Sequence, residues 1–170
     1  MRWSQHRGRF LLAAAALSLV AVVCVASSGS AAPRTPGASA NQTLTLVGKR
    51  GAFTLPAVPA LGIGFLAGGG LYDSTGATEL GQAYSNCSVV AISVAVPPVI
   101  TAECLTVFSL SGGDLYLSSL RDYLSGGFTS AKLAVLGGTG SYNDVRGDGT
   151  VTATDSTAHS YTFTVNLLSS

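Results

Sequence analysis

Charged residues are scarce in this chain. Asp, Glu, Lys and Arg make up 10% of its 170 residues, whereas hydrophobic residues make up 47%. An ordinary soluble domain has roughly 25% charged residues, so Ser, Thr and Gly must supply most of the polar surface here. No basic stripe with interleaved aromatic residues is present, and this argues against the surfaces that bind nucleic acids. We therefore expect no nucleic-acid partner.

Side chains that ligate metals or cofactors are also few. Beyond the N-terminal segment the only histidine is His159, and no cysteine or histidine spacing typical of a zinc site occurs. Residues 62–67 formally match a dinucleotide-binding fingerprint, but three glycines follow where that fingerprint needs a helix to begin. The nucleophile-elbow motif of hydrolases is absent too. The sequence thus predicts no metal, no nucleotide and no other cofactor.

The first 31 residues have the features of a secretory signal peptide. Arg2, Arg7 and Arg9 precede an apolar run over residues 10–26, and small residues lead to a cleavage site at residues 29–31. Two alternatives stay open. The run has 17 residues, slightly short of the roughly 20 that span a bilayer as an anchor helix. Cys24 raises a lipoprotein alternative, although bulkier residues precede it than lipoprotein processing normally accepts. We expect cleavage after Ala31 and a secreted, extracellular protein whose composition looks bacterial.

Removal of this leader changes the charge balance. Three of the nine Lys and Arg residues leave with it, so six remain against eight Asp and Glu, a net charge of about −2. Residues 32–40 are rich in Pro and small polar residues, which indicates a disordered tail. Residues 41–170 are enough for one domain with a sizeable core. Without the leader, the sequence predicts no membrane partner.

After the tail, the hydrophobic pattern has a period of two rather than the helical period. Gly, Pro, Asn and Asp interrupt it and mark turns. The clearest strand is the last, in which Tyr161, Phe163, Val165 and Leu167 share one face. The pattern predicts eight strands, over residues 41–48, 61–71, 79–94, 100–110, 115–120, 129–136, 149–154 and 160–168. Eight short strands with turns between them are typical of a sandwich or a closed barrel.

Two cysteines remain in the exported chain, Cys87 and Cys104, and an even count in an exported protein suggests a disulfide bond. If residues 83–94 and 99–110 form a hairpin that turns near residues 96–98, Cys87 lies opposite Cys104. The same register sets Phe108 against Ala83, a large side chain against a small one. Cross-strand neighbours lie about 4.5–5.5 Å apart between Cα atoms, which suits a disulfide. We therefore predict a Cys87–Cys104 bridge.

Residues 132–149, KLAVLGGTGSYNDVRGDG, combine a short apolar strand, a GGTG turn, Tyr142 and an Arg146-Gly147 pair. This segment resembles the C-terminal hairpin of the dirigent and allene oxide cyclase-like barrel family. Residues 80–90 look like the strand that carries a cysteine in allene oxide cyclases, where the thiol is free. The resemblance covers roughly residues 61–168 and implies an all-β fold, an eight-stranded antiparallel up-and-down barrel. Such a barrel is just wide enough to be filled by side chains or to hold one small ligand.

The resemblance also implies candidate site residues. In dirigent-like proteins, acidic residues after the second strand assist coupling or cyclisation by proton transfer, and residues 71–76 look like that region. Asp73 is therefore the candidate acid, with a pKa raised by burial at the barrel mouth. Tyr72, Tyr84 and Tyr116 are candidates for lining the cavity and hydrogen-bonding a ligand, and Arg146 is a candidate for facing an anion. Structural alternatives stay open, in which Asp73 caps its own turn, the tyrosines pack, and Arg146 braces the hairpin.

Two functional hypotheses follow. In the first, the barrel holds a small apolar or aromatic ligand and steers its cyclisation or coupling, as an isomerase or a dirigent-like protein does. In the second, side chains fill the barrel, and the protein is a non-catalytic secreted structural or binding protein. A cavity of about 300 Å³ or more with convergent polar groups would favour the first. Because relatives in the resembled family are commonly trimeric, we also expect a homo-oligomer.

Overall fold

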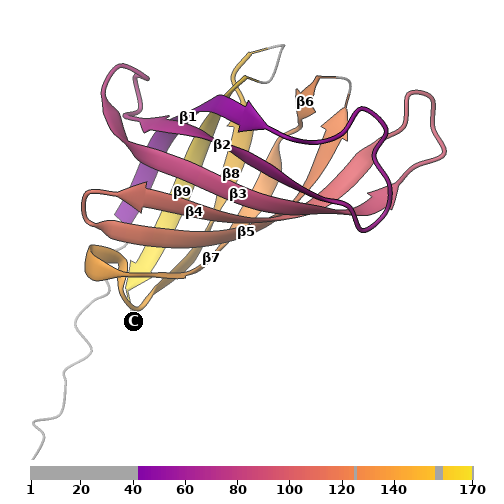
Figure 1. Ribbon diagram of the computed structural model, residues 1–170. Helices are drawn as coiled ribbons and strands as arrows, with labels where there is room; N and C mark the ends of the chain where they lie inside the picture. The colour runs from indigo at the N-terminus through magenta and orange to yellow at the C-terminus, as the bar shows by residue number, and fades with distance from the viewer. Residues whose placement is uncertain (1–41, 125, 156–158, 170) are drawn as a thin grey trace, which may run out of the picture. The chain divides into compact units, whose positions relative to one another are not determined.

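The computed structural model describes residues 42–124, 126–155 and 159–169. The predicted leader, residues 1–31, and the predicted tail, residues 32–40, lie outside the described residues. The structure is built from strands (Figure 1) and one short 3-10 turn, η1 (Gly140–Tyr142). The strands are β1 (Gln42–Phe53), β2 (Gly64–Tyr72), β3 (Glu79–Ile92), β4 (Ile100–Leu110), β5 (Gly113–Leu124), β6 (Gly127–Phe128), β7 (Ala131–Gly138), β8 (Val145–Ala153) and β9 (Ser160–Ser169).

Within these ranges, eight long strands form a closed antiparallel barrel. Each long strand pairs with the next one along the chain, from β1 with β2 to β8 with β9. Pairing of β9 with β1, from Leu167 opposite Gln42 to Ser160 opposite Lys49, closes the ring. The two-residue strand β6 folds back onto the end of β5. The predicted up-and-down barrel is confirmed, and the sandwich alternative is excluded.

Alternation along each strand separates the interior of the barrel from its outer face. In β9, Tyr161, Phe163, Val165 and Leu167 are buried, whereas the residues between them are more exposed. Phe108 from β4 is fully buried and packs edge-to-face on Phe163, with ring centroids 5.0 Å apart. Burial of one such side chain stabilises the fold by roughly 1.5–3 kcal/mol. The core is therefore the barrel interior, as the period-two pattern predicts.

The β3–β4 hairpin has the register predicted from the sequence. Cys87 lies opposite Cys104, and Ala83 lies opposite Phe108. The two cysteines form a disulfide with Cα atoms 4.1 Å apart, and both are buried inside the barrel. The predicted bridge is confirmed, so Cys87 has no free thiol of the kind found in allene oxide cyclases.

The glycines of β2 allow β1 to approach closely and to bend. A Cβ atom on Gly69 would lie 1.9 Å from the carbonyl oxygen of Lys49, a distance that no side chain tolerates. Opposite this point, the register of β1 shifts between Arg50 and Ala52, which marks a β-bulge. The bend of β1 therefore comes directly after Arg50.

The GGTG segment, residues 137–140, forms the turn between β7 and η1. The backbone N–H of Thr139 donates to the carbonyl of Asp114 at 2.8 Å, and the Thr139 hydroxyl accepts from the Asp114 N–H at 2.9 Å. Gly140 has a φ of 58°, in the left-handed region that favours glycine. These bonds tie the turn to the start of β5, so the motif has a structural role.

Three strands are longer than predicted by more than one residue: β5, β8 and β1, which runs to Phe53 rather than ending at residue 48. Strand β5 continues past residue 120 because its pairing with β4 extends to Tyr123 opposite Ile100. Strand β8 begins at Val145 rather than at residue 149, because Val145 is buried and pairs with Ser169. A barrel strand exposes every second residue to solvent, so charged residues such as Asp122 and Arg146 lie within these strands.

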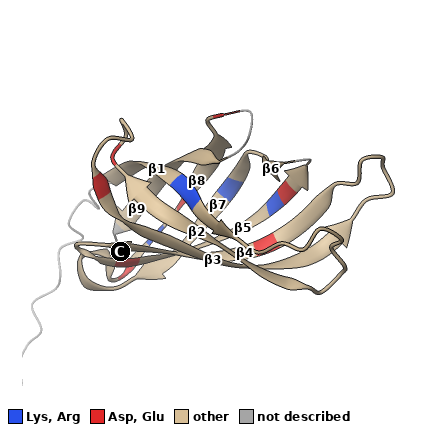
Figure 2. Ribbon diagram, turned by 45° about the horizontal axis from the view of Figure 1, so that its top comes forward, with Lys and Arg blue, Asp and Glu red and all other residues tan. Residues whose placement is uncertain are grey.

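The few charged residues are spread over the strands and turns (Figure 2), with Lys49 next to Arg50 and Arg121 next to Asp122, so no patch of one sign dominates the described part of the molecule. Between residues 42 and 169, no described helix has the length and hydrophobicity needed to cross a membrane.

Candidate functional site

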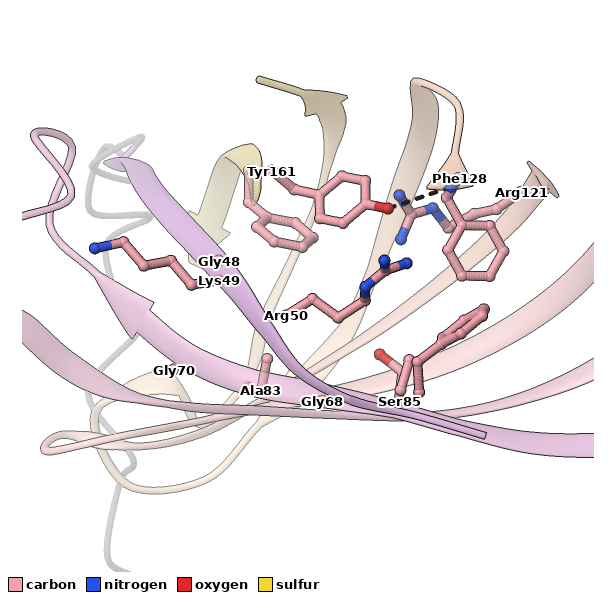
Figure 3. A pocket seen from close by; sticks show the side chains of 14 residues that line it. Gly48, Lys49, Arg50, Gly68, Gly70, Ala83, Ser85, Arg121, Phe128 and Tyr161 are labelled. Atoms are coloured by element: carbon pink, nitrogen blue, oxygen red, sulfur yellow. Dashed lines mark hydrogen bonds between the residues drawn. The ribbon is translucent and has the colours of Figure 1, made fainter. Parts of the chain in front are cut away.

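A cavity lies inside the barrel, toward the end at which β1 and β5 stop and β9 begins (Figures 1 and 3). Its walls come from β1, β2, β3, β5, β6 and β9. The side chains that line it are small, aromatic or cationic, and they include Ala67, Ala83, Ser85, Phe53, Phe128, Phe163, Tyr161, Arg50 and Arg121. We call this space the barrel cavity.

The barrel cavity is small in this conformation. The space that the centre of a water molecule can reach measures about 50 Å³, within a hollow of about 440 Å³ that includes the open mouth. One water molecule needs about 10–15 Å³ measured in this way, so the cavity has room for a few waters. It does not reach the 300 Å³ expected of a preformed ligand site. A ligand larger than a few heavy atoms therefore requires side chains at the mouth to move.

Strand alternation brings two arginines into the barrel cavity. Arg50 follows Leu46 and Gly48 on the inward face of β1, at the last residue before the bulge. Arg121 follows Leu117 and Ser119 on the inward face of β5, opposite Ala102 of β4. Both guanidinium groups point into the same space (Figure 3), whereas the Lys49 side chain points away from it.

Aromatic rings surround both guanidinium groups. The Arg121 Cζ lies 4.4 Å from the centroid of Phe128 and 4.8 Å from that of Tyr161. The Arg50 Cζ lies 5.0 Å from the centroid of Phe53, which itself packs edge-to-face on Phe128 at 5.9 Å. Cation–π contacts of this kind hold the two charges against the cavity wall.

Tyr161 fixes the position of Phe128. The backbone N–H of Phe128 donates to the Tyr161 hydroxyl at 3.2 Å, a bond drawn in Figure 3. This contact ties the short strand β6 to the interior of the barrel, so Phe128 covers the side of the cavity next to Arg121. The hydroxyl oxygen accepts in this bond and keeps its own proton for a further acceptor.

The electrostatics of the barrel cavity are set by Arg121. Burial lowers the pKa of Arg121 from its ordinary value to about 10, an effect that Tyr161 partly offsets. The guanidinium therefore stays charged at neutral pH. No acidic side chain lines the cavity among the described residues.

A second hollow lies over β7, β8 and β9, where Lys132, Asp148 and Asn166 line it. Its water-sized space, about 140 Å³, is larger than that of the barrel cavity. However, those three side chains are exposed, and the Asn166 amide already donates to Asp148 at 3.0 Å. We regard it as a surface groove. Within the described ranges, no group of three or more His, Cys, Asp or Glu residues could hold a metal ion.

The three predicted tyrosines do not line the barrel cavity. Tyr84 is 58% exposed and Tyr116 is 38% exposed, and both belong to the outer face of the sheet. Tyr72 packs beside Lys49, whose ammonium lies 4.0 Å from the ring centroid. Alternation explains the outward positions of Tyr84 and Tyr116, because Ala83 and Leu115 next to them point inward. A binding role for these tyrosines stays a prediction, which the geometry of the cavity does not support.

Asp73 forms the turn between β2 and β3, at the opposite end of the barrel from the cavity. Its carboxylate accepts the Thr75 hydroxyl at 2.7 Å and the backbone N–H groups of Thr75 and Ala77 at 3.1 and 3.0 Å. These bonds, led by that of the Thr75 hydroxyl, hold the pKa of Asp73 well below its ordinary value. We expected a raised pKa, and that expectation is wrong because the carboxylate caps its own turn. The role of Asp73 as a proton donor stays a prediction without support from this geometry.

Arg146 braces the β7–β8 hairpin. Its Nη1 donates to the Val145 carbonyl at 2.7 Å and lies against Gly137, where a Cβ would come within 2.8 Å of it. The side chain is exposed and does not line the barrel cavity. This arrangement matches the bracing alternative for Arg146.

The cavity residues missed by sequence reasoning are Arg50, Arg121, Phe128 and Tyr161. A signal for two of them was present. Tyr161 shares the inward face of β9 with Phe163, and Arg121 lies an even number of residues from Leu115 and Leu117. The predicted strand over residues 115–120 stops one residue before Arg121, whereas Arg121 is a buried interior group of β5.

Comparison with solved structures finds barrels of the same kind. Pyocyanin demethylase aligns with a TM-score of 0.59 at 19% identity, over 74% of this chain and 99% of its own. The chain shares the fold of this small barrel. A nonspecific heme-binding cyclase that catalyses a cycloaddition in neoabyssomicin biosynthesis aligns with a TM-score of 0.54 at 16% identity, over 75% of this chain and 63% of its own. At these identities the likeness shows the fold alone. No protein-family model and no curated protein matches the chain, so the resemblance to dirigent and allene oxide cyclase-like proteins stays a prediction.

Proposed function

We propose that the protein binds a small apolar or aromatic molecule inside its barrel. The barrel cavity carries this proposal, because aromatic walls and a few polar groups converge in one interior space. Small-molecule sites typically combine mostly apolar walls with a small number of polar groups that orient the ligand. The cavity residues Arg50, Arg121 and Tyr161 supply those polar groups here.

The solved neighbours support the same class of ligand. By its name, pyocyanin demethylase acts on pyocyanin, and the cyclase binds heme and catalyses a cycloaddition. We do not extend heme binding to this protein. The side chains that line the barrel cavity include no histidine, thiolate or thioether. Tyr161, the one potential iron ligand among them, already accepts the Phe128 N–H and lies against Arg121.

We further propose that the barrel steers cyclisation or coupling of its ligand, without a metal or nucleotide. The walls would hold one reactive conformation of the ligand, which lowers the entropic part of the barrier. Arg121 would stabilise negative charge that develops during the reaction. Tyr161 would donate a proton, since its oxygen accepts from Phe128 while its hydrogen is available.

A second candidate function rests on the small volume of the cavity. A space of about 50 Å³ for water centres has room for only a few waters. In this alternative the protein is a non-catalytic structural or binding protein that acts through its outer surface.

A cavity-filling variant tests the proposal against this alternative. Ala83 lines the cavity, so Ala83→Leu should displace a ligand, whereas Asn86→Leu adds a similar side chain on the exposed face of the same strand. Native mass spectrometry of protein from its natural source should detect a retained small molecule, lost in Ala83→Leu and kept in Asn86→Leu. Absence of any bound molecule, together with no binding of aromatic probes at millimolar concentration, would support the filled barrel. Overpacking costs typically 1–3 kcal/mol, so thermal unfolding must show that both variants are folded.

We propose that the protein is exported and released after cleavage near Ala31. The basic start, apolar run and small-residue cleavage site of residues 1–31 support this proposal. Intact-mass measurement of protein from the culture medium should give a chain that begins near residue 32. A full-length chain retained with the cells would contradict it.

We also propose a homo-oligomer. Tyr84, Leu105 and Tyr116 lie on the neighbouring strands β3, β4 and β5 and are exposed on the outer face. Neighbouring exposed apolar side chains often mark an interface between subunits. Light scattering at micromolar concentration should find more than one copy, and a monomer would remove the proposal.

A further inference from the structure

Three donor atoms on the two arginines of the barrel cavity have no hydrogen-bond partner. Arg121 is 9% exposed, and its Nε and Nη2 atoms are buried with no hydrogen-bond acceptor among the described residues. The Nη1 of Arg50 is likewise buried without an acceptor. Buried polar groups in folded proteins nearly always have a partner, so three such donors in one cavity call for an explanation.

The side-chain carboxylates of the chain do not provide one. All eight Asp and Glu residues fall within the described ranges, and none of them lines the barrel cavity. Asp122, the neighbour of Arg121, accepts the Thr101 hydroxyl at 2.7 Å and belongs to the exposed face of β5. The cavity therefore has an excess of positive charge.

An excess of buried positive charge is costly to a fold. Removing an ion from water carries a penalty of several kcal/mol unless an opposite charge compensates it. Phe128 and Tyr161 compensate in part through their ring faces. The remaining requirement is an acceptor that comes from outside the described residues and enters between the two guanidinium groups.

From these contacts we infer that the ligand of the barrel cavity is an aromatic or apolar molecule that carries one anionic group, such as a carboxylate. The anion lies between Arg50 and Arg121, and the apolar part lies against Phe53 and Phe128. A guanidinium fork suits a carboxylate because it forms two parallel N–H···O bonds. This inference rests on the proposed function and specifies the chemical class of its ligand.

A matched pair of probes separates the inference from the proposed function. The first probe is 2-naphthoate, which has two fused aromatic rings and a carboxylate. The second is 2-naphthamide, which has nearly the same shape and no charge. Equilibrium dialysis of the purified protein at low ionic strength gives an affinity for each. We expect 2-naphthoate to bind roughly ten- to a hundredfold more tightly, as charge-assisted hydrogen bonds allow.

Variants of the cations give the decisive comparison. In Arg121→Met the affinity for 2-naphthoate should fall to within about threefold of the affinity for 2-naphthamide. Arg50→Met alone should also reduce the preference for 2-naphthoate over 2-naphthamide. Arg121→Lys keeps the charge but loses the fork, and should give an intermediate preference. Lys132→Met removes an exposed charge from β7 and should retain the full preference. Circular dichroism should show that each variant is folded.

Each outcome has one meaning. Equal affinity of the unmodified protein for both probes would overturn the inference and leave the proposed function standing. A preference for 2-naphthoate that Arg121→Met and Arg50→Met do not reduce would overturn the inference, because the anion would then bind elsewhere. Failure of both probes to bind at millimolar concentration would overturn the proposed function, and the inference with it.

Discussion

Removal of the buried charge of Arg121 should make the free protein more stable. Burial lowers the pKa of Arg121 from its ordinary value to about 10. At 1.36 kcal/mol per pKa unit, this difference corresponds to a cost of roughly 3 kcal/mol for keeping the cation inside the barrel at neutral pH. Cation–π contacts with Phe128 and Tyr161 offset about 1–2 kcal/mol of this cost. Arg121→Met removes both effects and keeps most of the apolar packing.

The net prediction is a gain of about 1–2 kcal/mol in the free energy of unfolding, in the range seen when apolar residues replace buried ions. Because a lowered pKa disfavours the charged form, the cost is present below pH 10. The cost disappears as the pH rises through the folded-state pKa of about 10 toward the higher pKa of arginine in the unfolded chain. The advantage of Arg121→Met should therefore shrink above pH 10.

Urea unfolding at pH 7, followed by far-UV circular dichroism, measures this difference. Lys132→Met is the control for loss of an exposed charge, and it should change stability by less than about 0.5 kcal/mol. A loss of more than about 1 kcal/mol in Arg121→Met would refute the reasoning, since it would mean that the guanidinium has a stabilising partner in the free protein.

Three further predictions concern the frame of the barrel. A thiol assay on unreduced, denatured protein without its leader should find no free thiol. The free energy of unfolding should fall by roughly 3 kcal/mol in the double variant Cys87→Ala and Cys104→Ala, because the bridge joins residues 17 positions apart. The free energy of unfolding should fall by about 1–3 kcal/mol in Gly140→Ala, because Gly140 has a positive φ that alanine rarely adopts. An unchanged stability in thermal unfolding would contradict the assigned turn. Asp73→Asn should lower the midpoint of thermal unfolding at pH 7 and leave probe binding unchanged. Because the pKa of Asp73 is lowered in the fold, the difference in unfolding midpoint between the unmodified protein and Asp73→Asn should decrease as the pH drops below about 4. Weaker probe binding by Asp73→Asn would instead support Asp73 as a site residue.

Most of the fold follows from pattern and spacing. The period-two alternation of β9 and the register of Cys87 with Cys104 were both readable in the sequence, because one buried face fixes the register of a strand. The period-two pattern alone does not predict that the barrel closes, and only the family resemblance favoured closure. Strand ends were missed where charged residues such as Arg121 and Asp122 lie inside a strand.

The site was harder to predict than the fold. Tyrosines were chosen by residue type, although the predicted register of Ala83 already implied that Tyr84 points outward. Asp73 was chosen by analogy, whereas the hydroxyl of Thr75 two residues later gives it a turn role. Arg50 points inward by the alternation of β1, but the predicted strand over residues 41–48 stops before it, and the bulge that follows Arg50 depends on the partner strand.

A crystal structure of the protein with 2-naphthoate would test the central claim most directly. We predict the naphthyl rings against Phe53 and Phe128, with carboxylate oxygens about 2.7–2.9 Å from nitrogens of Arg50 and Arg121. A naphthoate bound on the outer face, or a barrel cavity that stays closed at saturating naphthoate, would contradict the account.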